Sequence, residues 1–212
     1  MLRVSHLSCS RGNKPLFADV NFHVQAGQAL HLEGDNGVGK TSLLRMVCGL
    51  SPADAGEVCW QEQNIRHNPT AYRAALFYLG HDVSLKEDLT ALENLLSDAA
   101  IAGRTLTQPR AMDALARMGL RGREHLPLRV MSQGQKRRTA LARLLASQAT
   151  LWILDEPFVA LDAKAVDGLR ALMANHLSQG GMVLFTSHQP VALMHGDGTR
   201  ADMSTYRLKG AA

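Results

Sequence analysis

Three short, mostly apolar runs stand out from an otherwise mixed chain: residues 29–33, 151–154 and 182–185. Runs of this length are typical of strands that are buried on both faces of a parallel sheet. We interpret the residues from about Met1 to Val24, returning around Gly56 to Gln61, as an antiparallel β region. The pattern therefore predicts parallel and antiparallel strands in one chain.

Helical spacing of apolar residues begins soon after the first run. Between Thr41 and Leu50 the apolar positions recur at i, i+3/i+4 and i+7, which predicts a helix with one buried face. These positions are Leu43, Leu44, Val47 and Leu50. Three further segments look helical, with breaks at glycines between them. They are residues 93–101, residues 108–118, and a helix after Ser132 that continues through Lys136 to about Ala146.

The segment between the first run and that helix matches the phosphate-loop pattern G-x-x-x-x-G-K-[ST]. Its glycines allow successive N–H groups to turn inward around phosphate oxygens, and the helix N-terminus favours an anion. Lys40 would reach the β- and γ-phosphates, and the Thr41 hydroxyl would ligate Mg²⁺. The alternative without a nucleotide-binding role is a glycine-rich turn followed by a chance Lys-Thr pair. The predicted ATP-binding residues are Gly34, Asp35, Asn36, Gly37, Val38, Gly39, Lys40, Thr41 and Ser42.

Two carboxylates follow the second apolar run, at the strand end where open α/β sheets bind their ligands. Asp155 would hold Mg²⁺ through water, and Glu156 would act as the general base on the attacking water. Such a pair also occurs in ordinary loops.

Two more motifs lie downstream of the phosphate loop. Ser132 is a good N-cap for the helix that continues through Lys136 to about Ala146, and a free helix N-terminus with a serine hydroxyl can bind an anion. A capped helix without a ligand is the alternative. His188 follows the third apolar run, directly after Thr186-Ser187.

These four motifs, in this order, resemble the ATP-binding cassette of ABC transporters over nearly the whole chain. Pro157 and Leu161-Asp162 are similar to the family's D-loop. The resemblance implies an α/β fold with a P-loop (RecA-like) nucleotide-binding core, an N-terminal antiparallel β subdomain and an inserted helical subdomain. We expect a single domain over residues 1–212, with the core at 27–80 and 136–212 and the helical subdomain at about 81–135.

The resemblance also implies catalytic and binding roles. His188 would be catalytic beside Glu156, bonding the γ-phosphate of ATP. Ser132, Gly134 and Gln135, from a signature that here reads Met-Ser-Gln-Gly-Gln, would contact the ATP held by a second copy of the chain in an ATP-sandwich dimer.

Two positions depart from the family pattern. His81 stands where a glutamine is usual, and would contact the Mg²⁺ shell near the membrane-subunit contact; the alternative is a packed loop residue. Arg11 stands where an aromatic usually stacks on adenine. A guanidinium can also stack on a base, but Arg11 can equally be a solvated loop charge.

Within the family, the chain resembles the ATP-binding subunits of the cytochrome c maturation system, through residues 149–158, Gly80-His81 and 188–190. This implies an ATP-hydrolysing subunit at the cytoplasmic face of the inner membrane, bound to integral membrane subunits that export haem or release a haem chaperone. Alternatives are a soluble ABC ATPase acting on ribosomes or DNA, the ATPase of a different ABC importer or exporter, and a non-catalytic nucleotide-binding module.

Composition narrows these alternatives. The chain has 212 residues and a net charge of +4, and no apolar stretch is as long as a transmembrane helix or a secretory signal requires. The basic cluster at 136–138 suits proximity to phosphate more than a nucleic-acid-binding face. The cysteines show no metal spacing and no haem-attachment motif, so we expect reduced thiols and no direct haem binding. They are Cys9, Cys48 and Cys59.

Overall fold

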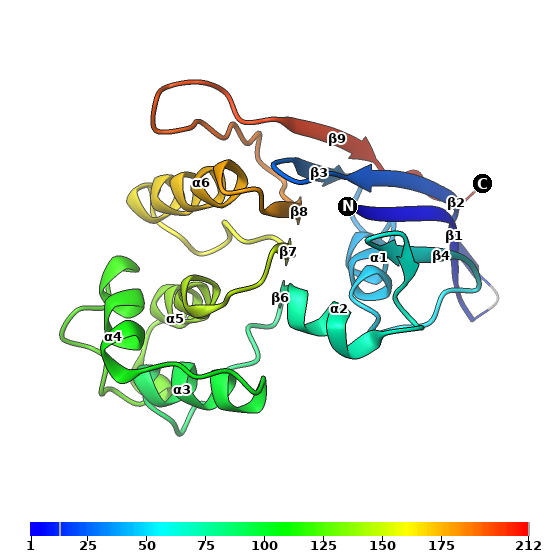
Figure 1. The fold of residues 1–212 in the computed structure, drawn as a ribbon. Helices are drawn as coiled ribbons and strands as arrows, with labels where there is room; N and C mark the ends of the chain where they lie inside the picture. Colours follow the sequence, from blue (N-terminus) through cyan, green and yellow to red (C-terminus); the bar gives the residue numbers. More distant parts are fainter. Residues whose placement is uncertain (13, 212) are drawn as a thin grey trace. The chain divides into compact units, whose positions relative to one another are not determined.

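In the computed structural model, which describes residues 1–12 and 14–211, the apolar runs become the middle of a five-stranded parallel sheet (Figure 1). Its strand order is β6-β7-β8-β3-β9. These strands are β3 (Ala29–Glu33), β6 (Leu76–Leu79), β7 (Leu151–Leu154), β8 (Met182–Thr186) and β9 (Met203–Arg207). Every residue of β7 and β8 is buried, as expected for strands covered on both faces. Asn13 and Ala212, which belong to the predicted single domain, lie outside the described residues.

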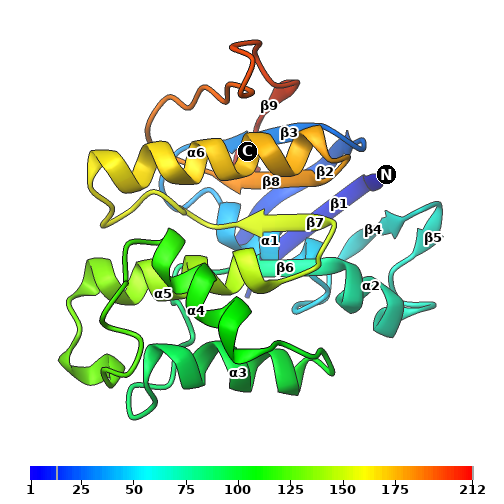
Figure 2. The same ribbon diagram turned by 60° about the vertical axis from the view of Figure 1, so that its left-hand side comes forward.

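The predicted antiparallel β region forms a second sheet with the order β2-β1-β4-β5. Its strands are β1 (Leu2–Arg11), β2 (Lys14–Val24), β4 (Ala55–Trp60) and β5 (Gln63–Asn64). Helix α1 (Lys40–Val47) lies between the two sheets (Figures 1 and 2). Buried side chains from both sheets and from α1 form one hydrophobic core, which fixes the helix relative to the strand ends.

The described residues form two compact units. The core unit comprises Met1–Gly80, Ala149–Pro157 and Arg170–Ala212, and the helical unit comprises His81–Gln148 and Phe158–Leu169. The core unit also contains α2 (Pro69–Ala75), and α6 (Ala163–Ser178) runs from one unit into the other.

The helical unit is built from α3 (Ala91–Ile101), α4 (Gln108–Arg117), the short 3-10 helix η1 (Leu128–Val130) and α5 (Gln133–Ala146). We expected the core to resume at residue 136, but α5 belongs to the helical unit. Its Ala142 packs in a cluster with Leu95 of α3 and Leu115 of α4, so the helix is held by that cluster.

The predicted end of the phosphate-loop helix is wrong. The helix ends at Val47, because Gly49 adopts a left-handed conformation (φ 70°) and the Leu50 N–H bonds back to the carbonyl of Arg45 at 2.8 Å. Leu50 therefore leaves the apolar face and is 53% exposed. Cys48 caps the helix and is buried.

Candidate nucleotide-binding site

The phosphate loop connects β3 to α1 along a path that requires glycine. At Gly34 (φ 153°) a Cβ would lie 2.9 Å from the carbonyl oxygen of Leu208, and at Gly39 (φ 106°) it would lie 3.0 Å from the ring of Phe17. The loop therefore presents its backbone without side chains at these two points, which leaves N–H groups accessible to an anion.

Lys40 lies at the start of α1 and turns back over this loop. Its Nζ donates to the carbonyl oxygens of Gly34 and Asp35, at 2.7 and 3.1 Å. The ammonium group is thus held at the loop that the sequence assigns to phosphate. Among the other predicted loop residues three are exposed and two are half-buried: Asp35, Asn36 and Gly37, then Val38 and Ser42.

Asp155 lies at the carboxyl end of β7 and is 2% exposed. Its Oδ2 accepts a hydrogen bond from the Thr41 hydroxyl at 2.7 Å, and its Oδ1 accepts one from the Thr186 hydroxyl at 2.8 Å. Its N–H donates to the carbonyl of Leu79 at 2.7 Å. The buried carboxylate is therefore fixed between the phosphate-loop helix and β8, as a buried charge requires.

Glu156 follows in a left-handed conformation (φ 49°), which is unusual for a residue with a side chain. Its N–H donates to the Thr186 hydroxyl at 2.8 Å, so Thr186 bonds to both acidic residues. The Oε1 of Glu156 lies 3.5 Å from Nε2 of His188. The Glu156 side chain is 14% exposed and that of His188 57%, so the histidine is the more accessible of the two.

Thr186 is a residue whose importance the sequence did not reveal. It appeared as part of the Thr186-Ser187-His188 motif, but periodicity does not show which strand-end hydroxyl will face a carboxylate on the neighbouring strand. The parallel register of β7 and β8 brings it there.

Tyr78 lies on β6, next to β7. Burial first, and then the nearby carboxylate of Asp155, raise the pKa of Tyr78 to about 12. Burial likewise raises the pKa of the Cys48 thiol. The phenol of Tyr78 and the thiol of Cys48 are therefore neutral at physiological pH.

The signature motif lies at the N-terminus of α5 in the helical unit. Ser132 Oγ accepts from the Gln135 N–H at 3.3 Å, while Gln135 Oε1 accepts from the Ser132 N–H at 3.0 Å. This capping box confirms Ser132 as the N-cap, and Ser132 is exposed. At Gly134 a Cβ would lie 3.1 Å from the carbonyl of Ala160, so a larger residue would displace that loop. Met131, the first residue of this motif, is a buried core residue.

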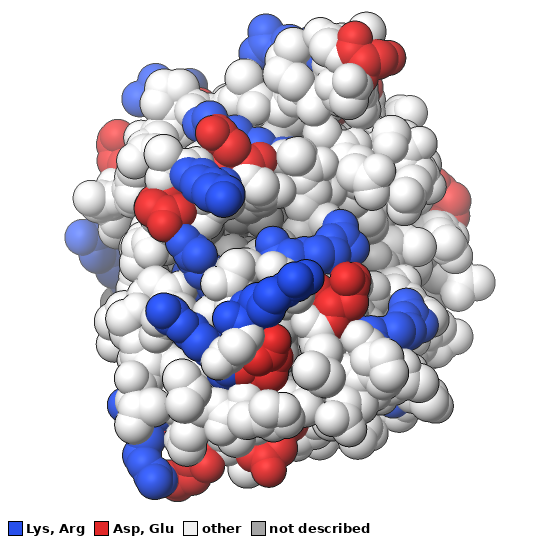
Figure 3. All heavy atoms as spheres, turned by 90° about the vertical axis from the view of Figure 1, so that its left-hand side faces the viewer, with Lys and Arg blue, Asp and Glu red and all other residues white. Residues whose placement is uncertain are grey.

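The basic residues beside the signature, 136–138, are paired or buried within the helical unit. Lys136 pairs with Glu87 at 2.5 Å, Arg138 pairs with Asp162, and Arg137 is buried. Carboxylates of the same unit thus pair with two of these charges, and their expected proximity to phosphate stays a prediction. On the face drawn in Figure 3, Lys and Arg side chains are interspersed with Asp and Glu. Such mixing favours ion pairs over a uniform nucleic-acid-binding surface.

Two predicted positions are exposed. His81 is the first residue of the helical unit, and Arg11 is the last residue of β1. The three cysteines are buried free thiols.

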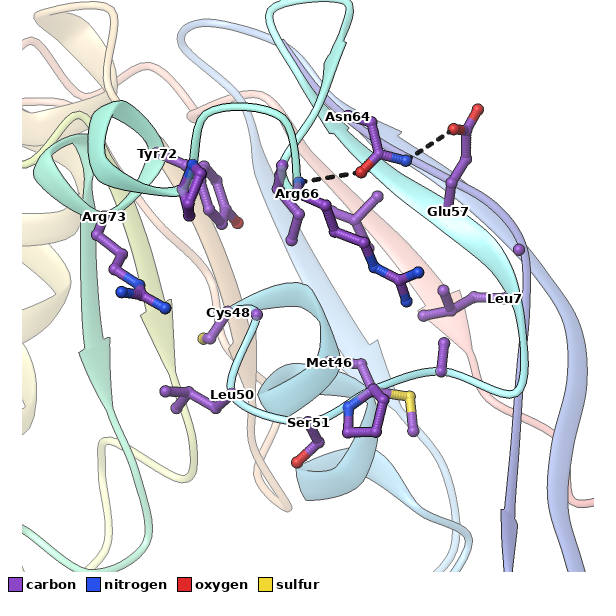
Figure 4. A pocket seen from close by; sticks show the side chains of 17 residues that line it. Leu7, Met46, Cys48, Leu50, Ser51, Glu57, Asn64, Arg66, Tyr72 and Arg73 are labelled. Carbon is purple, nitrogen blue, oxygen red and sulfur yellow. Dashed lines mark hydrogen bonds between the residues drawn. The ribbon is translucent and has the colours of Figure 1, made fainter.

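A cavity of about 570 Å³ lies in the core unit between the C-terminal end of α1, the β4–β5 hairpin and α2 (Figure 4). Its lining is apolar at Leu7 and Met46, and Arg66 and Arg73 bring positive charge to it. Tyr72, another lining residue, donates a hydrogen bond to the carbonyl of Val47 at 2.7 Å. None of the predicted nucleotide-site residues lines this cavity.

Among the described residues, no helix is long and apolar enough to span a membrane.

The fold and the site define an ATP-binding cassette, and the profile of the ABC transporter family matches residues 17–159. CcmA, the cytochrome c biogenesis ATP-binding export protein of Dechloromonas aromatica, is 50% identical over 92% of this chain and 96% of its own length. CcmA of Escherichia coli O157:H7 is 44% identical over 98% of both chains. The chain belongs to this family of cytochrome c biogenesis ATP-binding export proteins, and it is an ATP-binding subunit of the ABC type that hydrolyses ATP.

Solved structures agree on the fold. An ATP-binding subunit of an ABC transporter has a TM-score of 0.79 and 27% identity, covering 89% of this chain and 80% of its own. A putative ABC transporter ATP-binding protein from Pyrococcus furiosus has a TM-score of 0.82 at 23% identity, covering 98% and 96%. The predicted α/β P-loop fold and the predicted family are therefore confirmed.

Proposed function

We propose that this chain hydrolyses ATP to drive a membrane complex for c-type cytochrome biogenesis. The observation that supports the chemistry is the cluster at the end of β7, where Asp155 and Glu156 are joined through Thr186 and Asp155 is bonded to Thr41. Such a cluster places a carboxylate, a hydroxyl and a candidate base beside the phosphate loop.

The donors at this cluster fit Mg²⁺. Mg²⁺ prefers oxygen ligands and is usually held by one or two protein groups together with waters and phosphates. Thr41 and Asp155 supply a hydroxyl and a carboxylate within hydrogen-bond distance of each other, at 2.7 Å. Among the described residues no cluster of three His, Cys, Asp or Glu forms a metal site, and Mg²⁺ does not require one. When bound, Mg²⁺ would neutralise charge on the β- and γ-phosphate oxygens.

The chain's residues then divide the work on ATP. The phosphate loop binds the phosphates, Lys40 faces the β- and γ-phosphates, and His188 bonds the γ-phosphate. Glu156 accepts a proton from the attacking water while the oxygen of that water bonds to the γ-phosphorus. The bond from that phosphorus to the β–γ bridging oxygen breaks, and ADP and phosphate leave.

A second copy of the chain completes the site in this proposal. Ser132, Gly134 and Gln135 of one copy would face the ATP bound by the other. The exposed N-terminus of α5 supports this, because its hydroxyl and N–H groups can donate to an anion. ATP would close the dimer and hydrolysis would reopen it.

The membrane role follows from the CcmA relatives, which are named as export proteins of cytochrome c biogenesis. We infer that the chain sits peripherally at the cytoplasmic face of the inner membrane, against an integral membrane subunit, and that its cycle works on haem or a haem chaperone. We expect no direct haem or nucleic-acid binding. The alternatives are a soluble ABC ATPase and the ATPase of a different ABC importer or exporter.

Two experiments test this role. Affinity purification of the tagged chain from native membranes should recover an integral membrane subunit, identified by mass spectrometry. Cells that lack the protein should lose haem-stained c-type cytochromes and keep b-type haem proteins. The wild-type gene should restore the c-type signal, and the Glu156→Gln gene should not. Unchanged c-type cytochromes in the deletion strain would contradict the membrane role while leaving the ATPase assignment intact.

A further inference from the structure

His31 is a polar residue in the middle of β3, three residues before the phosphate loop. Its side chain is buried, at 4% exposure. A polar group in this setting needs a hydrogen-bond partner, since leaving it without one would cost free energy of folding. The identity of that partner indicates what His31 does.

The partner is a backbone carbonyl beside the predicted catalytic histidine. His31 lies opposite Phe185 in the parallel pairing of β3 and β8, and the two rings stack with centroids 4.7 Å apart and an interplanar angle of 0°. The stack directs Nε2 of His31 to within 3.2 Å of the carbonyl oxygen of Ser187. Because a carbonyl can only accept, Nε2 carries the hydrogen and donates it.

The segment that follows β8, Ser187 to Gln189, is also fixed by its own hydrogen bonds. The Ser187 hydroxyl donates to the Gln189 carbonyl at 3.0 Å and accepts from the Gln189 N–H at 3.0 Å. The Ser187 carbonyl belongs to the planar peptide unit that also contains the His188 N–H. Holding that carbonyl therefore sets the direction in which the His188 side chain leaves the backbone.

We propose that His31 is a positioning residue for ATP hydrolysis, which acts by orienting the Ser187–His188 peptide plane. The result of that orientation is the 3.5 Å approach of His188 Nε2 to Glu156 Oε1. The second ring nitrogen of His31, Nδ1, lies 3.4 Å from the Oε1 of Glu33, the residue before the loop. The inference rests on the proposed role of His188.

The chain offers a control at another histidine contact, around the half-buried His176. His176 stacks on Trp152 with centroids 3.7 Å apart, and its Nε2 lies 3.2 Å from the carbonyl oxygen of Thr150. This contact has the same parts, an aromatic stack and a carbonyl partner, but none of its residues belongs to the predicted site.

The test compares His31→Phe, which keeps an aromatic ring and removes the donor, with His31→Gln, whose amide can still donate. Both are measured in the full chain beside His176→Phe, by steady-state ATP hydrolysis, ATP affinity and thermal unfolding. For His31→Phe we expect kcat to fall by about tenfold to a hundredfold, with KM for ATP within about twofold of wild type, because a misaligned group mainly affects the reacting geometry. His31→Gln should restore most of the rate, and His176→Phe should keep it.

A double variant tests whether His31 affects the rate of ATP hydrolysis through His188. In a His188→Ala background, His31→Phe should reduce the remaining rate no further, because the group that it positions is gone. If the phenylalanine is too large for the core, His31→Leu serves in the same comparison.

Three results would overturn the inference: a wild-type rate for the donor-free variant, an equal loss for His31→Gln, or an undiminished effect in the His188→Ala background. A His188→Ala protein that hydrolyses ATP normally would instead refute the proposed role of His188, and the inference with it. An impaired His188→Ala protein beside a fully active His31→Phe protein would reject the inference alone.

Discussion

The carboxyl end of β7 and the N-terminus of α5 both carry predicted ATP-binding residues, but they are built differently. At β7 the carboxylate of Asp155 is buried and accepts hydrogen bonds from two threonine hydroxyls. At α5 the hydroxyl of Ser132 is exposed and bonds to its own helix. The core unit thus fixes its groups within one chain, whereas the N-terminus of α5 stays exposed, which is the end that a second chain would use in the proposed dimer.

The largest expected effect is on the fixed side of this comparison. Lys40→Ala removes the ammonium group that lies over the phosphate loop and is bonded to the carbonyls of Gly34 and Asp35. We expect tight ATP binding or turnover to be abolished while the fold is retained. Titration with a fluorescent ATP analogue and a phosphate-release assay would measure both. Wild-type activity in this variant would reject the phosphate-loop assignment.

Glu156→Gln should separate binding from chemistry. The substitution keeps the shape of the side chain and removes the base, so hydrolysis should fall by roughly 10²- to 10⁴-fold. ATP binding should persist, and size-exclusion chromatography with ATP should show a closed dimer that wild type forms only transiently. Normal hydrolysis would exclude Glu156 as the base. A monomer without ATP would not bear on the role, since the dimer is expected to need nucleotide.

The sequence predicted the parts of the molecule whose local pattern is strong. The bounds of β3 and β7 match the predicted runs, because buried parallel strands leave continuous apolar stretches. The edge strand β9 (Met-Ser-Thr-Tyr-Arg) carries no such run and was missed, as were α2 and α6. The position of β9 depends on its pairing with β3, which is distant in sequence. The two helices do carry local signals, in the Asn68-Pro69 start of α2 and in the helical spacing of Leu169, Met173 and Leu177 in α6.

For the candidate site, the motifs identified the residues expected to act on ATP but not the residues that hold them in place. Lys40, Thr41, Asp155 and Glu156 could be picked out because their chemistry depends on residue type and spacing. Thr186 acquires its importance from the neighbouring strand, and the sequence gives no signal for that pairing. The same limit explains Leu50, which fits the helical period but lies beyond a left-handed glycine.

The N-terminus of α5 can be tested against a helix with the same cap. Ser132→Ala and Thr90→Ala each remove the hydroxyl of a capping box, the second one at α3, where Thr90 bonds to Glu93. Each should lower the free energy of unfolding by about 1 kcal/mol. Ser132→Ala alone should also reduce ATP-dependent dimer formation and turnover, by about tenfold for one lost hydrogen bond to a charged phosphate. Equal turnover in the two variants would contradict the dimer proposal.

Thr186→Val tests how far the fixed side depends on its hydroxyl. The replacement is similar in shape but removes the donor to Asp155 Oδ1 and the acceptor of the Glu156 N–H. Because Thr186 is fully buried, the lost bonds should cost about 1–3 kcal/mol in the free energy of unfolding. Thermal denaturation would measure this, with Thr186→Ser as the control that keeps the hydroxyl. Turnover should fall with Val and be largely kept with Ser, and equal stability of all three proteins would count against the bonded cluster.

The smallest effect on ATP binding is expected at His81, which is exposed at the first position of the helical unit. If it replaces the family's glutamine as proposed, its imidazole contributes one hydrogen bond near the Mg²⁺ shell and the membrane-subunit contact. His81→Gln should then keep appreciable ATPase activity. His81→Ala should lower cytochrome c assembly more than it lowers ATP affinity, because it removes a link between the two processes and leaves the phosphate loop untouched.

His125→Ala, at an exposed histidine of the same unit, is the control. ATP affinity measured on purified protein and haem staining of complemented cells separate these effects. Wild-type behaviour of His81→Ala in both assays would make His81 an ordinary surface residue. Other groups of the helical unit would then have to couple ATP hydrolysis to cytochrome c assembly.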